Sequence, residues 1–244
     1  MKTIVIKMGG VASSQLNQQF FDKIHLWQAE GYQIVIVHGG GKYISKMMQE
    51  LNQKIEIRNG LRVTSEKALT ITKMVLLGQV QPNILSAFQK AGLVTIGLNA
   101  SCNQLIQGEL IDLKQLGYVG RATACNYNFL QALLKENYIP VIAPLGMTAK
   151  GQWLNINADE VACQVAGDLQ AEKLYLLTDV AGIKKAGNYL KELCFAEIET
   201  FKKEKIVTAG MLPKINSAQK ALVSGVSSVY ISNTLDTGTR LKAV

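Results

Sequence analysis

The chain of 244 residues is 48% hydrophobic and 18% charged, which is typical of a globular protein with a sizeable core. Its net charge of +8 suits an anionic ligand or nucleic acid, but the lysines form no block and aromatic residues make up only 7%, so the sequence lacks a base-stacking tract. No apolar run reaches the roughly 18 residues of a membrane span, and we expect neither nucleic acid nor a membrane as partner.

The first predicted strand, TIVIKM at residues 3–8, ends in Lys7-Met8-Gly9-Gly10. A lysine interrupts its short apolar run, so the segment is not a signal peptide and we expect a cytoplasmic protein. Two glycines after a strand let a phosphate approach backbone N–H groups, and Lys7 can add a positive charge. A plain turn from strand to loop is the alternative.

A second strand, QIVIVH at residues 33–38, leads into the triple glycine 39–41 and a predicted helix over residues 42–51. Glycines before a helix free several N–H donors, and the helix N-terminus favours an anion. We therefore expect an anion or substrate loop here. His38 ends the strand and is expected to hold the loop by hydrogen bonds rather than to act in chemistry.

An Asn59-Gly60 turn follows and presents Arg62, whose guanidinium can grip a carboxylate with two hydrogen bonds or form a surface salt bridge. Residues 66–90 have the apolar spacing of one long amphipathic helix. Its apolar stripe comprises Leu69, Thr72, Leu76, Val80, Ile84 and Phe88.

Further strands are predicted at residues 93–98, 139–145, 173–179 and 228–233, and further helices at residues 126–137 and 159–167. The segment 104–113 is predicted to form a short hairpin that turns at Gly108-Glu109. Strands that alternate with helices predict an α/β fold with a mostly parallel sheet covered on both faces.

Polar groups cluster before the helix at residues 159–167, where Asn155-Ile156-Asn157-Ala158-Asp159 holds more amide and carboxylate groups than one helix cap needs. Another strand ends in Thr178-Asp179-Val180-Ala181-Gly182, which is the usual position for a nucleotide. Lys214 lies in the first turn of a helix, where the dipole disfavours a cation, so we expect a bound anion to compensate it.

The four cysteines form no CxxC pair and lie near no histidine, so we expect neither a zinc site nor disulfides. They are Cys102, Cys125, Cys163 and Cys194.

Eight motifs in this order resemble those of the amino-acid-kinase family, from about residue 3 to residue 241: KMGG, HGGG, NGLRVT, LGYVG, NINAD, TDVAG, GMLPK and GTR. NGLRVT with NINAD is most similar to family members that phosphorylate N-acetyl-L-glutamate. KMGG and HGGG are shared with members that act on carbamate, glutamate, aspartate or UMP. The chain departs from the family in the loop 99–104 and at Ala209.

The resemblance implies a three-layer αβα sandwich with two lobes, an acid-binding and dimer-forming lobe at residues 1–169 and an ATP-binding lobe at residues 170–244. It implies that Lys7 and Lys214 stabilise the transferring phosphoryl group and that Asp159 positions both lysines. The other implied sites are Gly40, Gly41, Arg62 and Asn155 for the acid, Gly9 and Gly10 for phosphate, and Asp179, Val180, Ala181, Gly182, Ile183, Lys184, Ile206, Val207 and Thr208 for the nucleotide.

The implied reaction transfers a phosphoryl group from ATP to the side-chain carboxylate of N-acetyl-L-glutamate and gives an acyl phosphate of arginine biosynthesis. The acceptor is already ionised at neutral pH, so no general base is needed. Mg²⁺ is expected on the ATP phosphates, with no metal site of the protein itself. The alternatives are a kinase for a related acid such as carrier-linked aminoadipate, and a non-catalytic nucleotide-binding sensor. A nucleobase acceptor such as UMP is disfavoured by Arg62.

The resemblance also implies a homodimer. Arginine-inhibited members of the family carry an extra helix before the first strand, and since the first strand here begins near Thr3, we expect no inhibition by arginine. The helix at residues 66–90 is the expected dimer contact, with its apolar stripe paired across a twofold axis. The alternative is that this stripe packs on the sheet of its own chain.

Overall fold

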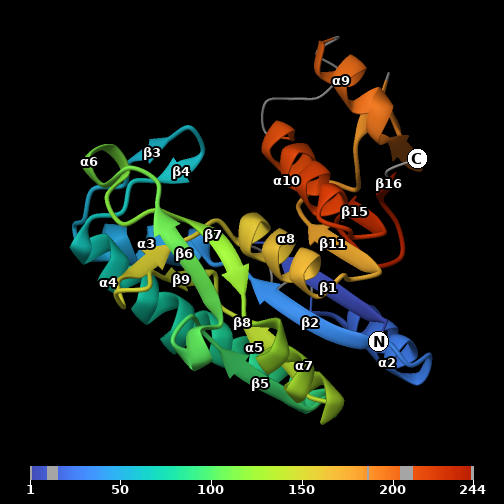
Figure 1. Cartoon of the computed structure of the whole chain (residues 1–244), viewed down its shortest axis with the longest axis horizontal. Helices are drawn as coiled ribbons and strands as arrows, with labels where there is room; N and C mark the ends of the chain where they lie inside the picture. The colour runs from blue at the N-terminus through green and yellow to red at the C-terminus, as the bar shows by residue number, and fades with distance from the viewer. Residues whose placement is uncertain (1, 10–15, 186, 204–210, 243–244) are drawn as a thin grey trace.

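The computed structural model describes residues 2–9, 16–185, 187–203 and 211–242. Its centre is an eight-stranded sheet in the order β14-β16-β15-β11-β1-β2-β8-β5 (Figure 1). Six of these strands are parallel to one another. They are β1 (Thr3–Met8), β2 (Gln33–His38), β5 (Thr95–Leu98), β8 (Ile139–Ile142), β11 (Lys173–Leu177) and β15 (Ser228–Ser232). All six match strands predicted from sequence, and the prediction of a mainly parallel sheet is confirmed.

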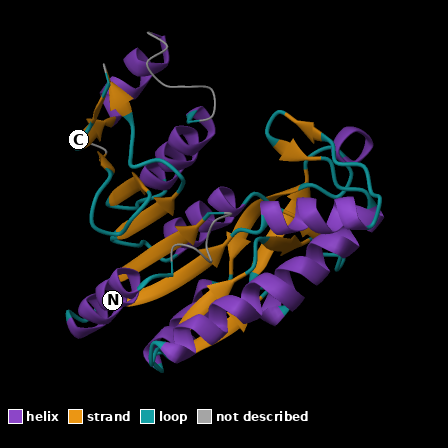
Figure 2. Cartoon of the chain, turned by 180° about the vertical axis from the view of Figure 1, so that it is seen from behind, coloured by secondary structure: helices purple, strands orange, loops and turns teal. Residues whose placement is uncertain are grey.

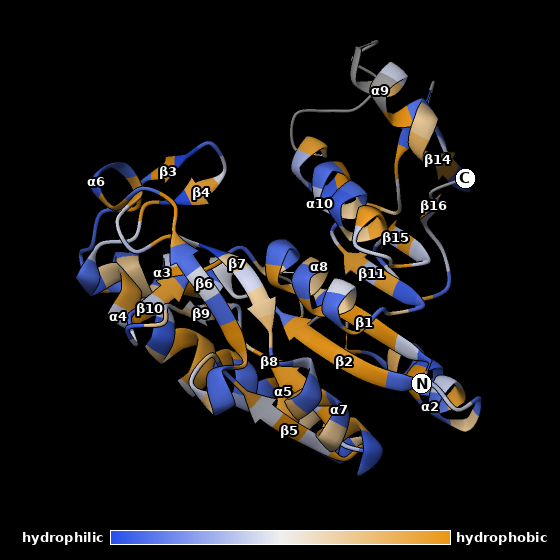
Figure 3. Cartoon of the chain, viewed as in Figure 1, coloured by the Kyte–Doolittle hydropathy of each residue, from blue (hydrophilic) through white to orange (hydrophobic). Residues whose placement is uncertain are grey.

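The remaining strands of this sheet, β14 (Glu192–Cys194) and β16 (Thr239–Lys242), run the other way, because β16 pairs antiparallel with β15. The central strands are hydrophobic along most of their length (Figure 3), as expected for strands buried on both faces. Helices α8 (Ala158–Asp168) and α10 (Leu212–Val223) lie side by side on one face (Figure 1). Helix α2 (Gln18–Ala29) and the long helical segment at residues 66–90 lie on the other (Figure 2).

The remaining helices are α3 (Gly41–Glu50), α6 (Leu113–Leu116), α7 (Tyr127–Lys135) and α9 (Phe195–Lys203), with a short 3-10 turn η2 (Cys102–Gln104). None of the helices in the described part of the chain has the length and hydrophobicity of a membrane span. The described residues also form two small hairpins. They are β3 (Ile57–Arg58) with β4 (Leu61–Arg62), and β12 (Lys184–Lys185) with β13 (Asn188–Tyr189).

The predicted helix at residues 66–90 is continuous but contains a π-helical turn, so that α4 (Glu66–Val75), η1 (Leu76–Val80) and α5 (Gln81–Lys90) follow without a break. Every residue of the predicted stripe is buried in its own chain, with at most 5% of the residue's surface exposed. The stripe therefore packs in the core, and the prediction that these side chains meet a second copy is wrong. The physical reason is that an apolar stripe can be buried either against a sheet of the same chain or against a helix of a second copy, and its spacing is the same in both cases.

A second, four-stranded sheet has the order β10-β9-β6-β7. Its strands are β6 (Ile106–Leu110), β7 (Gly120–Cys125), β9 (Leu145–Met147) and β10 (Trp153–Asn155). The predicted hairpin with a turn at Gly108 is wrong. Gly108 lies inside β6, which pairs with β7 and shifts register at this residue. A Cβ on Gly108 would lie 2.7 Å from the carbonyl oxygen of Arg121, so this glycine permits a close strand approach rather than a turn.

Candidate active site

The centre of the site is the carboxylate of Asp159, which binds two lysines from different parts of the chain. Lys7 Nζ, near the end of β1, lies 2.7 Å from Asp159 Oδ1. Lys214 Nζ, from the first turn of α10, lies 3.3 Å from Oδ2. Both Lys7 and Asp159 are buried, with side chains no more than 10% exposed, whereas the side chain of Lys214 is 21% exposed. The structure thus brings together the three residues predicted for catalysis.

Local structure explains why Asp159 lies where it does. It occupies the first turn of α8, where the helix dipole favours a negative charge. Its backbone N–H is bound by the side-chain oxygen of Asn157, the N-cap, at 2.8 Å. Burial alone raises the pKa of Asp159, but the charges and hydrogen bonds of Lys7 and Lys214 offset this effect and hold the pKa below its ordinary value. The carboxylate is therefore ionised at neutral pH.

This arrangement also accounts for Lys214, whose position at a helix N-terminus is unfavourable by dipole alone. The sequence argument assigned its compensation to a bound anion. In the structure, the Asp159 carboxylate of the chain itself supplies that negative charge. The unfavourable position of Lys214 is therefore explained by an ion pair within the chain and is not by itself a sign of a ligand.

Three helices begin around this centre. Helix α8 begins next to Asp159, α10 begins next to Lys214, and α3 begins at Gly41 after the triple glycine. Among the residues that the structure describes, no side-chain hydrogen bond caps α3 or α10. Uncapped N–H groups at a helix N-terminus bind anions, and phosphate in particular. The site therefore combines two ammonium groups with uncapped helix ends.

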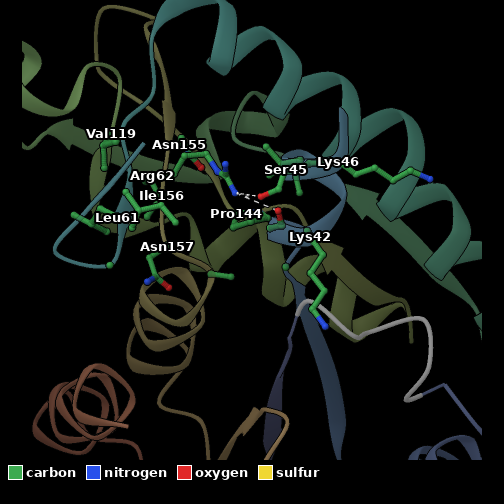
Figure 4. Close-up of a pocket in the computed structure, with 18 of the residues that line it drawn as sticks. Lys42, Ser45, Lys46, Leu61, Arg62, Val119, Pro144, Asn155, Ile156 and Asn157 are labelled. Atoms are coloured by element: carbon green, nitrogen blue, oxygen red, sulfur yellow. Dashed lines mark hydrogen bonds between the residues drawn. The ribbon is translucent and has the colours of Figure 1, made fainter. Parts of the chain in front are cut away.

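A cavity of about 630 Å³ opens beside Lys7 and reaches Arg62 and Asn155. Pockets of this size are typical of small-molecule sites. Gly40 and Gly41 line it at the start of α3. Figure 4 shows Arg62, Asn155 and Asn157 gathered on one side, with Lys46 pointing away from them. The predicted acid-binding residues therefore share one cavity with a predicted catalytic lysine.

Arg62 is docked against the first turns of α3. Its Nη2 donates to the hydroxyl of Ser45 at 2.7 Å and to the carbonyl of Gly41 at 3.2 Å (Figure 4). Nη1 lies 3.6 Å from the sulfur of Met48. Partial burial lowers the pKa of Arg62, but an arginine pKa starts so high that the guanidinium stays charged. The cavity therefore holds a fixed positive group suited to a carboxylate.

Asn155 ends β10 and donates from Nδ2 to the hydroxyl of Thr64 at 2.9 Å. Thr64 is fully buried and donates in turn to the carbonyl of Arg62 at 2.7 Å. The link that this hydroxyl makes between two predicted acid-binding residues was not recognised in the sequence, although Thr64 stands in the NGLRVT motif, two residues after Arg62.

The glycines of the two strand-end loops allow close packing. A Cβ on Gly40 would lie 2.4 Å from Leu76 of the π-helical turn, and a Cβ on Gly9 would lie 3.0 Å from the carbonyl of Leu177. Leu76 itself lines the cavity and was assigned only to the apolar stripe. The π-helical turn has no sequence signal that we recognised. Gly10, the second predicted phosphate-binding glycine, lies outside the described residues.

The predicted nucleotide-binding segment begins directly after β11. The Thr178 hydroxyl bonds to the Asp179 carboxylate at 3.0 Å, and this bond, assisted by the charges of Lys214 and Lys42, lowers the pKa of Asp179. Gly182 lies so close to Thr239 that a Cβ would come within 2.7 Å of its hydroxyl. That same hydroxyl accepts from the N–H of Ile183 at 2.8 Å.

Some of the other predicted nucleotide residues are described by the structure. Val180 and Ala181 are half-buried, and Lys184 is exposed in β12 beside the ring of Tyr189. The predicted residues Ile206, Val207 and Thr208 lie outside the described residues. The segment 178–184 thus stands at the carboxyl edge of β11, on the same edge of the sheet as Lys7.

His38 has the structural role predicted for it. It is fully buried, and its Nδ1 lies 2.9 Å from the carbonyl oxygen of Gly39. Burial lowers its pKa to about 4, although the bond to Gly39 opposes this shift. The ring is therefore neutral at pH 7, with Nδ1–H as donor to the loop.

The loop 99–104, where the sequence departs from its family pattern, does not line this cavity. It carries two residues with positive φ, Asn103 and Gln104, beyond the end of β5. The residues that line the cavity around Arg62 therefore come from other segments of the chain. Ala209, the second departure, lies outside the described residues.

The sequence model of the amino acid kinase family matches residues 2–233 of the chain. The acetylglutamate kinase of Listeria monocytogenes serotype 4a (strain HCC23) is 50% identical over 99% of this chain and 97% of its own length. That of Leuconostoc mesenteroides subsp. mesenteroides is 48% identical over 96% of each. A crystal structure from Streptococcus mutans UA159 matches with a TM-score of 0.93 and 39% identity over 99% of each chain. The chain therefore belongs to the amino acid kinase family.

Proposed function

We propose that this chain transfers the terminal phosphoryl group of ATP to the side-chain carboxylate of N-acetyl-L-glutamate. The products are an acyl phosphate and ADP, and the reaction is a step of arginine biosynthesis. The observation that carries the proposal is the placement of Lys7 and Lys214 on one carboxylate, beside a cavity that contains Arg62. The relatives named acetylglutamate kinase, which match nearly the whole chain, support this choice of acid.

The acceptor carboxylate is ionised at neutral pH and needs no base to remove a proton. This agrees with His38, which is buried and neutral and bonds to the loop backbone. The work left to the protein is positioning and the stabilisation of charge on the phosphoryl oxygens. Lys7 and Lys214 supply that charge, and Asp159 holds both ammonium groups at fixed positions.

The two substrates enter from different sides of Lys7. Arg62 and Asn155 bind a carboxylate of the acid, and the amides of Gly40 and Gly41 at the start of α3 bind its reacting end. The nucleotide lies along the segment 178–184 beside Lys214. This division corresponds to an acid-binding lobe at residues 1–169 and an ATP-binding lobe at residues 170–244, which meet between α8 and β11.

Mg²⁺ is carried on the ATP phosphates in this proposal. Among the described residues, His, Cys, Asp and Glu side chains form no group of three that could hold a metal ion. Asp159, the carboxylate at the centre, already binds two lysines, so its oxygens are engaged. Phosphate oxygens are the usual ligands of Mg²⁺ in such sites, with few carboxylates from the protein. The chain would work as a homodimer in the cytoplasm, where ATP is available.

The proposal is tested by measuring ADP release from Mg-ATP with a panel of acids. The panel contains N-acetyl-L-glutamate, N-acetyl-L-aspartate, L-glutamate, carbamate, UMP and N-acetyl-L-aminoadipate, and hydroxylamine traps any acyl phosphate. We expect ADP release and hydroxamate with N-acetyl-L-glutamate above all others. ADP release with another acid only, or nucleotide binding without turnover on any acid, would refute the proposed function.

A further inference from the structure

Thr64 joins the two residues proposed to bind the acid. Its Oγ1 donates to the backbone carbonyl of Arg62 at 2.7 Å and accepts from Asn155 Nδ2 at 2.9 Å. The side chain of Thr64 has no exposed surface, and Thr64 is not among the residues that line the cavity. The hydroxyl therefore binds two residues of the cavity wall, Arg62 and Asn155, but does not itself face the cavity.

The backbone of Thr64 is held as firmly as its side chain. Its N–H donates to the carbonyl of Leu116 at 2.8 Å, and its own carbonyl accepts from the N–H of Tyr118 at 2.7 Å. The carbonyl of Tyr118 then accepts from the N–H of Asn155 at 2.9 Å. The strap 116–118, part of the LGYVG motif, thus connects Thr64 to Asn155 through main-chain bonds.

Gly117 makes this strap possible. Its φ of +67° lies in the left-handed region, and a Cβ there would lie 2.2 Å from the carbonyl oxygen of Thr64. Only glycine lets the strap approach Thr64 this closely. The LGYVG motif, whose role the sequence did not explain, is therefore a spacer that sets the position of Thr64 relative to Asn155.

The direction of the two hydrogen bonds determines how Asn155 faces the cavity. A hydroxyl has one hydrogen, and that of Thr64 is given to Arg62, so the hydroxyl oxygen is left as acceptor for Asn155. The Asn155 amide must then turn its nitrogen to Thr64. This leaves its Oδ1 and its second N–H for a ligand.

We propose that Thr64 is a positioning residue that fixes Arg62 and Asn155 as one preformed unit for recognition of the acid. The inference rests on the proposed function and adds to it a determinant of acid affinity behind the cavity wall. Loss of the hydroxyl frees the Asn155 amide to rotate and leaves the Arg62 carbonyl without its side-chain donor. The hydrogen bonds that the described residues give Thr64 all lie on the acid side, at Arg62, Asn155 and the strap 116–118, so we expect affinity for ATP to be unaffected.

The test compares Thr64→Val, which keeps the shape and removes the hydroxyl, with Thr64→Ser, which keeps the hydroxyl. Thr72→Val is the matched control. Thr72 is also fully buried, and its hydroxyl bonds to the carbonyl of Ala68 at 2.7 Å, on α4. Both valine variants remove one buried hydroxyl, but Thr64→Val breaks two hydrogen bonds and Thr72→Val breaks the one to Ala68, so we expect the larger loss of stability in urea unfolding for Thr64→Val.

For Thr64→Val we expect a KM for N-acetyl-L-glutamate about tenfold or more above that of the parent, as for a lost hydrogen bond at a binding group. The KM for ATP is unchanged. We expect Thr64→Ser to keep the parent KM for the acid, and Thr72→Val to leave the KM for the acid and the KM for ATP unchanged. In an Asn155→Ala background, Thr64→Val has a smaller effect than in the parent, since one of its two partners is already gone.

An unchanged KM for the acid in Thr64→Val, or an equal rise in Thr72→Val, overturns the inference and leaves a structural threonine. Failure of Thr64→Ser to rescue also overturns it, because the hydroxyl would not be the active group. If the parent chain does not phosphorylate N-acetyl-L-glutamate at all, the proposed function fails and the inference falls with it. The parent assay therefore separates the two failures.

Discussion

Replacement of Asp159 by asparagine is the most informative single change, because it removes one negative charge from between two lysines. Lys7, whose side chain is only 9% exposed, would then stay buried and lose the carboxylate that pairs with it among the described residues. Lys214, at 21% exposure, would lose its partner in a position that the dipole of α10 already disfavours. Removing one partner of a buried ion pair costs about 3–5 kcal/mol, and the partial exposure of Lys214 places the expected loss near the lower limit, about 3 kcal/mol.

The same change removes what holds the two ammonium groups in place. We expect kcat to fall by roughly 100- to 1,000-fold, the effect typical of losing a preorganised charge stabiliser. A bound nucleotide brings its own negative charge to the lysines. A non-hydrolysable ATP analogue should therefore stabilise Asp159→Asn against urea more than it stabilises the parent.

Glu160→Gln is the matched control for this experiment. Glu160 also lies in the first turn of α8, and its carboxylate accepts from the N–H of Ala122 at 3.0 Å, away from the two lysines. Both variants lose an acidic charge favoured by the dipole of α8, but only Asp159→Asn breaks the ion pairs. Urea midpoints and kcat are measured for the parent and both variants. If Asp159→Asn behaves like Glu160→Gln in both measurements, the carboxylate does not organise the lysines and the reasoning is refuted.

Four further predictions concern the two lysines, Arg62, His38 and the number of chains in the assembly. Lys7→Ala and Lys214→Ala should lower kcat far more than they raise KM for either substrate; steady-state kinetics with a loss confined to KM would reduce both lysines to binding residues. Arg62→Lys keeps the charge but loses the planar fork, so KM for the acid should rise several-fold while KM for ATP holds, and titration calorimetry with equal acid affinity would contradict this. The pKa of His38 falls from about 6.5 in the unfolded chain to about 4 in the folded one, so stability is full above pH 6.5 and should decline toward pH 4 by at most about 3 kcal/mol. His38→Asn, which keeps a donor for Gly39, should flatten that part of the urea-midpoint profile, and an unaltered profile would exclude His38 as its source. Finally, light scattering after size exclusion should give the mass of two chains, and a mass of one would refute the homodimer.

Much of this fold is determined by local sequence. Uninterrupted runs of Val and Ile, such as those in β1 and β2, can be stabilised only by burial on both faces, so six strands of the central sheet were predictable in position and direction. The Asn59-Gly60 turn has φ of 50° and 79°, in the left-handed region that Asn and Gly tolerate better than other residues, so a turn was predictable there. The location of the site at the carboxyl ends of the strands follows from the parallel order of the sheet.

Contacts between distant segments were decided by the tertiary structure alone. The apolar stripe at residues 66–90 predicts a buried face but not its partner, and it packs in the core of its own chain. Gly108 predicts either a turn or a close approach, and only the pairing of β6 with β7 selects the second. The π-helical turn that brings Leu76 against Gly40 depends on that packing as well.

The same distinction holds within the site. Sequence named Lys7, Asp159 and Lys214 by resemblance, but their distances, and the use of Asp159 as the counter-charge of Lys214, required the crossing of β1, α8 and α10. Thr64 was invisible as a link, because its two partners stand on different strands and its hydroxyl has no pattern of its own. Periodicity and glycine chemistry are properties of a short segment, whereas ion pairs and hydrogen bonds between segments depend on sheet register and helix packing, which no short segment contains.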